Sequence, residues 1–362
     1  MGTHLHRCVP IFFHQTDQNM YPFPSINQFR HVITQVRHQA AYMGLDEAGE
    51  AIYNPAPKYP TLTFQGTVKL HGTNAAIVFE NGVTTFQSRE RVLTFEADNA
   101  GFYAHMNQPK MSWHLKCLQE AIAMELGCSG EVDDQLIAVY GEWCGGNIQK
   151  NVAIAGSPKM FVIFAVKVND VWQDISDMPL MREEASIYNI EDFPSWTINI
   201  DFEKPEIAQN MLAALTEKVE EMCPVGKAFG NEGIGEGIVW RCASDLTSEL
   251  WFKVKGEKHS ASKVKTLAST DVESVARIRD FVEQVVTPQR LEQGLANITN
   301  EKMLPFAMTS MGDFIRWVHA DVIKEESDTI LASQFDVKKL GGPIALVAKR
   351  WFVEQLNAAA MQ

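Results

Sequence analysis

The sequence predicts an α+β fold, with antiparallel sheets and flanking helices in a first domain and helices alone in a smaller second one. Two observations predict it. Alternating apolar residues recur in short runs between residues 62 and 255, and the turn Asn81-Gly82 joins two runs as an antiparallel hairpin. From Asp271 onward the apolar residues recur at helical spacing instead. We therefore expect a first domain over residues 1–266 and a helical domain over residues 267–362.

The first elements lead into the hairpin. Residues 26–43 carry apolar side chains at roughly helical spacing, and the proline-rich stretch 54–60 is typical of a loop. Residues 62–67 alternate between apolar and polar, which predicts a strand. Residues 75–79 and 83–86 form the hairpin arms, because Asn-Gly suits a turn in which both central residues need positive φ.

Four later runs are also predicted to be strands. Since successive side chains of a strand point to opposite faces, Phe161 and Phe164 should face opposite ways. For the same reason, Lys253 and Lys255 should leave one side of their strand together. The four runs span residues 136–140, 160–168, 237–241 and 250–255.

The last hundred residues are predicted to be helical. One predicted helix face carries Val272, Val275, Ile278, Phe281 and Val282. Pro343 suits the first turn of a second helix that runs to Leu356, because a first-turn residue has no helical partner for its N–H.

The composition indicates a soluble two-domain enzyme. At 362 residues, 46% hydrophobic and 21% charged, the chain can bury a substantial core. It has no apolar run long enough to cross a bilayer, so we expect a cytoplasmic protein, in the host cytoplasm if a phage encodes it. The six cysteines include no Cys-x-x-Cys pair, which argues against a zinc ribbon or a disulfide framework.

The charge of the chain restricts how it could bind a nucleic acid. The net charge of −13 argues against a uniformly basic nucleic-acid binder, but a local patch of lysines is enough to hold phosphates. Such a patch lies between residues 253 and 265, where the alternative is a solvated lysine-rich strand end. Its lysines are Lys253, Lys255, Lys258, Lys263 and Lys265. No metal role is expected for the N-terminal His4, His6, Cys8 and His14.

Lys69 is a candidate covalent nucleophile. It precedes the hairpin, and we expect it on a loop where Gly72 would allow a ligand to approach the backbone closely. A lysine amine reacts only when nearby cations, a metal or desolvation lower its pKa. We expect His71 to orient this loop. The alternative, an ordinary surface lysine, stays open on this string alone.

The order of the motifs resembles that of the covalent nucleotidyltransferase superfamily, whose ligases and capping enzymes attach a nucleotide to lysine. The His-Gly-Thr-Asn form of the first motif resembles the RNA ligase 2 family, which includes phage nick-sealing and editing ligases. The resemblance covers roughly residues 60 to 265. It is carried by Lys69-Leu70-His71-Gly72-Thr73-Asn74, Gly141-Glu142, residues 145–152, the strand around Phe164, Glu236-Gly237-Ile238-Val239 and Lys253-Val254-Lys255.

The resemblance implies a nucleotidyltransferase (ATP-grasp-like ligase) domain that uses ATP and Mg²⁺ or Mn²⁺. Lys69 would attack the α-phosphate of ATP, and Lys253 and Lys255 would bind phosphate and lower the pKa of Lys69. Glu236 would assist catalysis and the metal, which water and phosphate would mainly hold. The remaining nucleotide contacts implied are Leu70, Asn74, Arg89, Glu142, Phe164 and Val239.

The resemblance also implies the reaction. A monomer would join RNA 3′-hydroxyl and 5′-phosphate ends through a lysyl-AMP and an AMP-capped RNA, at nicks in duplex RNA, with the helical domain recognising the ends. Three departures are present: Ala165 replaces an expected aspartate, His259 replaces an apolar or aromatic residue, and the segment before Lys69 is long. The alternatives are a DNA ligase, a capping guanylyltransferase, and a catalytically silent RNA-binding protein of this fold.

Overall fold

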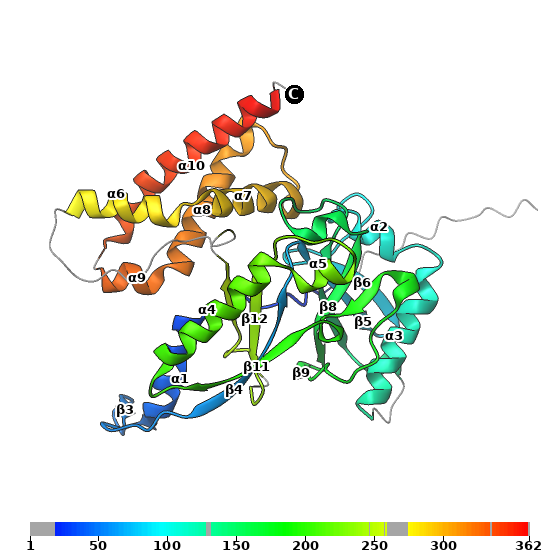
Figure 1. The fold of residues 1–362 in the computed structure, drawn as a ribbon, viewed down its shortest axis with the longest axis horizontal. Coiled ribbons are helices and arrows are strands. Elements are labelled where there is room, and N and C mark those ends of the chain that lie inside the picture. The colour runs from blue at the N-terminus through cyan, green and yellow to red at the C-terminus, as the bar shows by residue number, and fades with distance from the viewer. Residues whose placement is uncertain are drawn as a thin grey trace, which may run out of the picture.

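The computed structural model describes residues 19–127, 132–245, 247–256, 258, 274–333 and 335–360, and only the backbone of residues 274–277 and 332. The chain forms two parts, a sheet-containing body and a group of helices that lies above and to the left of it in Figure 1. The α+β class predicted from the sequence is confirmed. Several predicted features lie outside the described residues, namely the domain boundary at 266/267, His4, His6, Cys8, His14, His259, Lys263 and Lys265.

The first sheet carries most of the motif residues. Its strand order is β1-β13-β12-β4-β11, and every pairing is antiparallel except that of β1 with β13. Helix α4 (Pro205–Glu221) packs across β11, β12 and β13, while α1 (Phe29–Ala41) lies against β13. The strands are β1 (Asn27–Gln28), β13 (Phe252–Lys255), β12 (Gly237–Cys242), β4 (Thr61–Lys69) and β11 (Ser195–Asp201).

The second sheet contains the predicted hairpin. Its order is β10-β8-β7-β5-β6, with β9 paired to β8, and only β10 and β8 are parallel. Asn81 and Gly82 both have positive φ, as a type I′ turn requires. The strands are β10 (Ile187–Asn189), β8 (Met160–Val168), β7 (Ile137–Cys144), β5 (Thr73–Glu80), β6 (Val83–Ser88) and β9 (Val171–Gln173).

Smaller elements complete the body. Strands β2 (Tyr42–Leu45) and β3 (Ala51–Tyr53) form a separate hairpin, and the helices are α2 (Phe102–Met106), α3 (Met111–Glu125) and α5 (Pro224–Ala228). Short 3₁₀ turns of the body lie at Val132–Asp134, Ala153–Gly156, Glu183–Ala185 and Ile190–Asp192. The 3₁₀ turn Met308–Ser310 and the π turn Asn297–Glu301 belong to the C-terminal helices.

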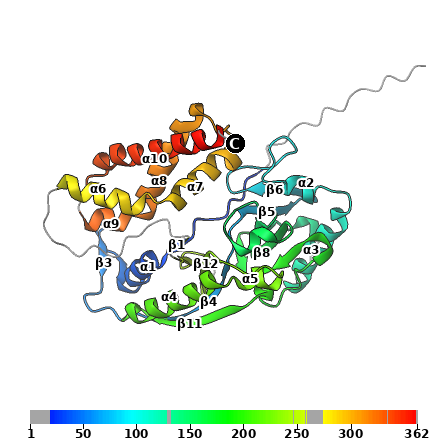
Figure 2. The same ribbon diagram turned by 45° about the horizontal axis from the view of Figure 1, so that its top comes forward.

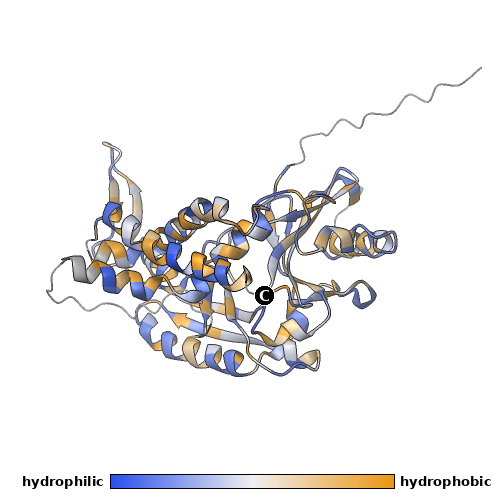
Figure 3. Ribbon diagram, turned by 90° about the horizontal axis from the view of Figure 1, so that it is seen from above, coloured by the Kyte–Doolittle hydropathy of each residue, from blue (hydrophilic) through white to orange (hydrophobic). Residues whose placement is uncertain are grey.

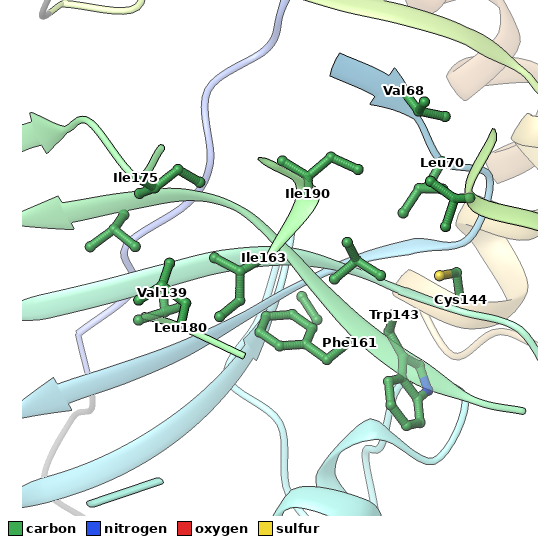
Figure 4. Close-up of a cluster of buried hydrophobic side chains, with 14 of the residues drawn as sticks. Val68, Leu70, Val139, Trp143, Cys144, Phe161, Ile163, Ile175, Leu180 and Ile190 are labelled. Carbon is green, nitrogen blue, oxygen red and sulfur yellow. The ribbon is translucent and has the colours of Figure 1, made fainter. Parts of the chain in front are cut away.

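One hydrophobic core spans the two sheets. The apolar sides of β4 and β12 contribute Phe64 and Trp240, while β7 and β8 contribute Val139 and Phe161. Figure 4 shows part of this core, with Val68 near the end of β4 and Leu70 on the chain that leaves it. Burying each large apolar side chain contributes roughly 1.5–3 kcal/mol, so the core fixes the two sheets against one another.

The C-terminal helices have a core of their own. Its buried members include Phe281, Phe314, Leu340 and Phe352. The described residues from 274 to 360 contain helices and no strand, and Figure 3 shows apolar and polar stretches alternating along them. None of the helices described is long and apolar enough to span a membrane. The helices are α6 (Ser274–Val285), α7 (Pro288–Ala296), α8 (Met311–Glu325), α9 (Ser327–Ala332) and α10 (Val337–Ala360).

The prediction that a helix begins at Pro343 is wrong. Helix α10 begins at Val337, and Pro343 lies inside it. An internal proline costs about 3 kcal/mol because it removes a helical hydrogen bond. The turn before the proline places Leu340 in the helical core, where it is fully buried, and this burial offsets much of that cost. The predicted face of α6 is confirmed for Ile278, Phe281 and Val282; Val272 and the side chain of Val275 are not among the described parts.

The long segment before Lys69 connects the two parts. Figure 2 shows it, in blue, running between the sheets and the helices. Gln28 pairs with Lys253 in the parallel β1–β13 contact, and its side-chain Nε2 donates to Oε2 of Glu325 at 2.8 Å. Arg30, in α1, forms an ion pair of 3.2 Å with Glu326. The segment therefore holds the end of α8 beside β13.

Candidate active site

Lys69 lies where the two sheets meet. It is the last residue of β4 in the first sheet, so the prediction that it lies on a loop is wrong. The loop begins at the next residue. Residues 70–72 then cross to β5 in the second sheet. The crossing requires glycine at position 72, because a Cβ there would lie 2.3 Å from the backbone oxygen of Trp143, and Gly72 also lines the cavity. Close packing on β7 therefore fixes the exit of the chain from Lys69.

Strand register places three motif positions side by side. Gly237 at the start of β12 pairs with Lys69 on one side and with Lys255 on the other. Gly237 has φ of 154°, and a Cβ would lie 2.1 Å from the oxygen of Val254, so glycine is required there. Glu236 directly precedes it. The sequence showed only the order of these motifs along the chain. The antiparallel pairing of β4, β12 and β13 brings Lys69, Glu236 and Lys255 together.

Glu236 is a buried carboxylate among cations. It is 2% exposed, and its Oε2 lies 2.7 Å from Nζ of Lys69 and 3.2 Å from Nδ1 of His71. Its Oε1 lies 2.9 Å from Nζ of Lys255. Burial raises the pKa of this carboxyl, but Lys255, Lys69 and His71 outweigh burial and hold the pKa well below its ordinary value. Glu236 is therefore ionised and positions the Lys69 amine.

Lys253 contacts the helical part instead. Its Nζ lies 3.2 Å from Oε1 of Glu325 at the end of α8. Burial, together with Lys255 and Lys69, lowers the pKa of Lys253 although Glu325 opposes the shift. Burial acts to raise the pKa of Glu325, but Lys253 and Gln28 lower it to about 2. Glu325 is thus ionised at neutral pH, and α8 contributes a carboxylate to the site.

Glu142 occupies the second sheet beside Lys69. It lies in β7, pairs with Asn74 of β5, and its Oε1 accepts a hydrogen bond of 2.8 Å from the Gly72 N–H. Burial raises the pKa of its carboxyl, and the charge of Lys69 offsets that rise only in part. Glu142 is half-buried, and its Oε2 makes no hydrogen bond to another described residue, so this carboxylate is suited to accept hydrogen bonds from a ligand.

The predicted opposite orientation of Phe161 and Phe164 is confirmed. Phe161 is fully buried against Phe102 in the core, whereas Phe164 is half-buried and faces the cavity. The rings of Phe164 and Phe23 pack edge to face, with their centroids 4.9 Å apart. Ala165, where the resemblance would expect an aspartate, is buried with the aromatic cluster around Phe23.

All of the predicted site residues line one cavity of about 1000 Å³ that extends from the sheets to the helices. A volume of this size holds a nucleotide and part of a second substrate. The sheet side contributes Lys69, Leu70, Asn74, Arg89, Glu142, Phe164, Glu236, Val239, Lys253 and Lys255. Lys258 of the predicted lysine patch lines it too.

The residues present fit a metal ion that arrives with a nucleotide. Among the described residues, no group of three or more His, Cys, Asp and Glu side chains could hold a metal. Both oxygens of Glu236 already face ammonium groups. Magnesium keeps several waters and readily takes phosphate oxygens, so Glu236 would be at most one protein ligand among them.

Sequence reasoning missed the contribution of the helices and of the N-terminal segment. Glu325, Gln28 and Arg30 line the cavity, and so does the face of α7 that carries Gln293. The acidic pair Glu325-Glu326 at the end of an amphipathic helix was a weak signal, because such pairs are usually solvated. Nothing in the sequence indicated that it would face Lys253.

Lys69 thus lies at the junction of two mainly antiparallel sheets. Residues 62–255 match the family model described as RNA ligase, and this is more than half of the 362-residue chain. The protein therefore belongs to the RNA ligase family. No match to the chain was found among curated proteins.

Solved RNA ligases of Naegleria gruberi are similar in part. A mutant with ATP and Mn has a TM-score of 0.39 at 15% identity, covering 66% of this chain and 57% of that one. An apo mutant gives 0.40 at 16% identity over 65% and 57% of the two chains. The enzyme with PPi gives 0.37 at 15% identity over 69% and 62%. The chain spans less than two thirds of these proteins, and the family assignment rests on the sequence match.

Proposed function

We propose that the protein is an ATP-dependent RNA ligase that joins a 3′-hydroxyl to a 5′-phosphate through a lysyl-AMP at Lys69 and an AMP-capped RNA. The observation that carries the proposal is the contact of Lys69 with the buried Glu236 inside the family-matched segment. A lysine held in one orientation in a nucleotide-sized cavity can reach a bound phosphorus.

In the first step Nζ of Lys69, whose side chain is 22% exposed, loses a proton to solvent and attacks the α-phosphorus of ATP. A P–N bond forms, the bond to the bridging oxygen breaks, and pyrophosphate leaves. Glu236 orients the amine rather than taking its proton, because a carboxyl with a pKa well below its ordinary value is a weak base. Lys255 lies on the opposite oxygen of Glu236 and limits how strongly that carboxylate holds the Lys69 ammonium.

The other lysine and a metal ion would stabilise the leaving group. Lys253 faces the same cavity and can bind a phosphate oxygen once Glu325 is displaced. Bound Mg²⁺ or Mn²⁺ would supply charge neutralisation at the phosphates, with Glu236 as its one candidate protein ligand. The two lysines and this carboxylate thus remain the proposed catalytic residues beside Lys69.

The remaining cavity residues are proposed to hold the nucleoside. Phe164 offers an aromatic ring for the base, Glu142 can accept hydrogen bonds from the ribose, and Arg89 can donate to the ribose or to a phosphate. Asn74 lies next to Glu142 through the β5–β7 pairing and is proposed to contact the phosphates. Leu70 and Val239 add apolar contacts in the same cavity.

The later steps use the same site. AMP passes from Lys69 to the RNA 5′-phosphate, regenerating the amine, and the 3′-hydroxyl then attacks that phosphorus and releases AMP. The helical part forms one wall of the cavity, which supports a role for it in placing the RNA ends. We propose a nick in duplex RNA as the substrate, a monomer as the working form, and residues 267–362 as the end-recognising domain.

Sealing assays test this function. Purified protein with ATP and magnesium should join a nicked RNA duplex faster than two single strands or a nicked DNA duplex, at one fixed salt concentration because phosphate contacts are salt-dependent. Joining of the DNA nick alone would favour a DNA ligase. Use of GTP with no joining would favour a capping enzyme, and absence of both reactions would favour a silent RNA-binding protein.

A further inference from the structure

Helix α7 forms a wall over the cavity. One of its faces packs into the helical core through Leu291 and Gly294, and a Cβ on Gly294 would lie 2.9 Å from the ring of Trp317. The opposite face lines the cavity that contains Lys69. Four carboxamides lie along this face and its continuation, which we call the amide row: Gln289, Gln293, Asn297 and Asn300.

The row is fixed to the sheet-containing body at both ends. At one end Nε2 of Gln289 donates to the backbone oxygen of Lys258 at 3.0 Å. At the other end Nδ2 of Asn297 donates to Glu90 at 3.0 Å, and Arg91 donates to the backbone oxygen of Asn300 at 2.9 Å. Gln293 lies between these anchors, four residues from each, on the same helix face.

Two polar groups of the row are available to a ligand. Oδ1 of Asn297 is buried and has no hydrogen-bond partner within the described parts of the chain. The side chain of Gln293 lines the cavity and makes no hydrogen bond to another described residue. A buried acceptor without a partner costs free energy, so a ligand that donates to Asn297 would remove that cost.

The chemistry of the row favours a hydroxyl over a phosphate. A carboxamide offers a donor and an acceptor, which matches a ribose hydroxyl that also does both. A phosphate needs donors and positive charge, yet the same wall carries the carboxylates of Glu292 and Glu301. The lysines on the sheet side of the cavity are better suited to bind the phosphates.

We propose that the amide row binds the ribose of the RNA strand that supplies the 3′-hydroxyl, with Gln293 and Asn297 contacting its 2′-hydroxyl. This inference rests on the proposed function and deepens it, because it assigns the discrimination of RNA from DNA ends to α7. Gln293 and Asn297 act here as specificity-determining residues and not in the attack by Lys69.

The test uses a nicked RNA duplex whose 5′ end already carries AMP, so that only the last joining step is measured. The 3′-terminal nucleotide is either a ribonucleotide or its 2′-deoxy form. In Gln293→Leu, joining of the ribose end should fall about 3- to 10-fold relative to wild type, the effect of losing one hydrogen bond. Joining of the deoxy end should not change, so the preference for ribose shrinks.

Matched variants separate this effect from a folding defect. Gln293→Ala should behave as Gln293→Leu does, with thermal melting of both compared with wild type. Gln355→Leu, on α10 outside the cavity, should keep the ribose preference of wild type. If both Gln293 variants still seal the nick and keep the ribose preference of wild type, the inference is overturned. Failure of the wild type to form lysyl-AMP and to seal would instead remove the proposed function, and the inference with it.

Discussion

The carboxylate of Glu325, on the last turn of α8, lies 3.2 Å from the ammonium of Lys253, on β13. Lys253 is one of the two lysines proposed to bind phosphate, so the helical part holds a residue that the nucleotide also needs. Gln28 of the N-terminal segment donates to the same carboxylate. A triphosphate bound at Lys253, as proposed, would therefore compete with Glu325 for this ammonium.

Glu325→Gln should make nucleotide binding easier. The variant removes the charge that competes with phosphate for Lys253, and a partly exposed ion pair contributes about 1 kcal/mol or less. We expect the KM for ATP in lysyl-AMP formation to fall by roughly two- to fivefold. Asp313→Asn removes a carboxylate from the other end of the same helix and should leave that KM unchanged. A KM for Glu325→Gln equal to or above that of wild type would show that the pair does not compete with ATP.

Glu142→Gln should stabilise the fold and weaken ATP binding. The Gly72 N–H can still donate to the amide oxygen, so the local hydrogen bond survives. Burial raises the folded-state pKa of Glu142, so the unfolded chain loses this proton first and wild type loses stability as pH rises above the ordinary carboxyl range. The melting temperature of the variant should therefore exceed that of wild type at neutral pH and approach it in acid. ATP affinity should fall by about tenfold.

A melting temperature below that of wild type at neutral pH would contradict this reading of Glu142. Calorimetric melting across a pH series gives the stability, and titration with ATP gives the affinity. The two measurements are independent, because the stability of the free protein does not require the nucleotide.

Lys255→Ala should slow lysyl-AMP formation by about 100-fold or more, since it removes a cation aimed at the phosphates. It also leaves Oε1 of Glu236 without its ammonium partner, so the carboxylate holds the Lys69 ammonium more strongly. The pH optimum of adenylylation should then move upward. The same is expected to a smaller degree of Lys253→Ala, because Lys253 pairs with Glu325 and not with Glu236. Wild-type rates and pH profiles in both variants would show that neither lysine acts on the phosphates or on Lys69.

A fragment ending at residue 266 should still form lysyl-AMP but join RNA poorly. The core of the sheets and the core of the helices are separate clusters, and the described contacts between the two parts are mainly polar. The fragment keeps Lys69, Glu142, Glu236, Lys253 and Lys255 and loses the wall formed by α7. Sealing of a nicked RNA duplex at the full-length rate would assign the helices another role.

Local patterns in the sequence predicted the strands that carry the motif residues, because each of these is a run with period 2 or an unbroken apolar run. They missed β11 (Ser195–Asp201) and the short strands β1, β2, β3, β9 and β10. The strand Met160–Val168 was predicted residue for residue, and the Asn81-Gly82 turn has its expected geometry. The pairing of Lys69 with Gly237 was beyond the sequence, since register between strands distant in the chain depends on the whole sheet. Pro343 misled the prediction because tertiary burial of Leu340 outweighed a local signal.

The predicted site residues were inferred from the resemblance to a family, and in the structure all of them line one cavity. The approach of Glu325 to Lys253 had no comparable signal. It depends on how α8 packs against the N-terminal segment. Polar contacts between residues far apart in the chain produce no periodic pattern in the sequence, so they could not be predicted from it.

The most direct test of the account is covalent labelling with ATP radiolabelled at the α-phosphate, followed by denaturing electrophoresis and mass spectrometry of the labelled peptide. We predict one AMP per chain, attached to Lys69, and no label on Lys69→Ala. Lys58→Ala, which removes an exposed lysine near the start of β4, should label as wild type does. Full labelling of Lys69→Ala, or attachment of AMP to another residue, would contradict the central claim.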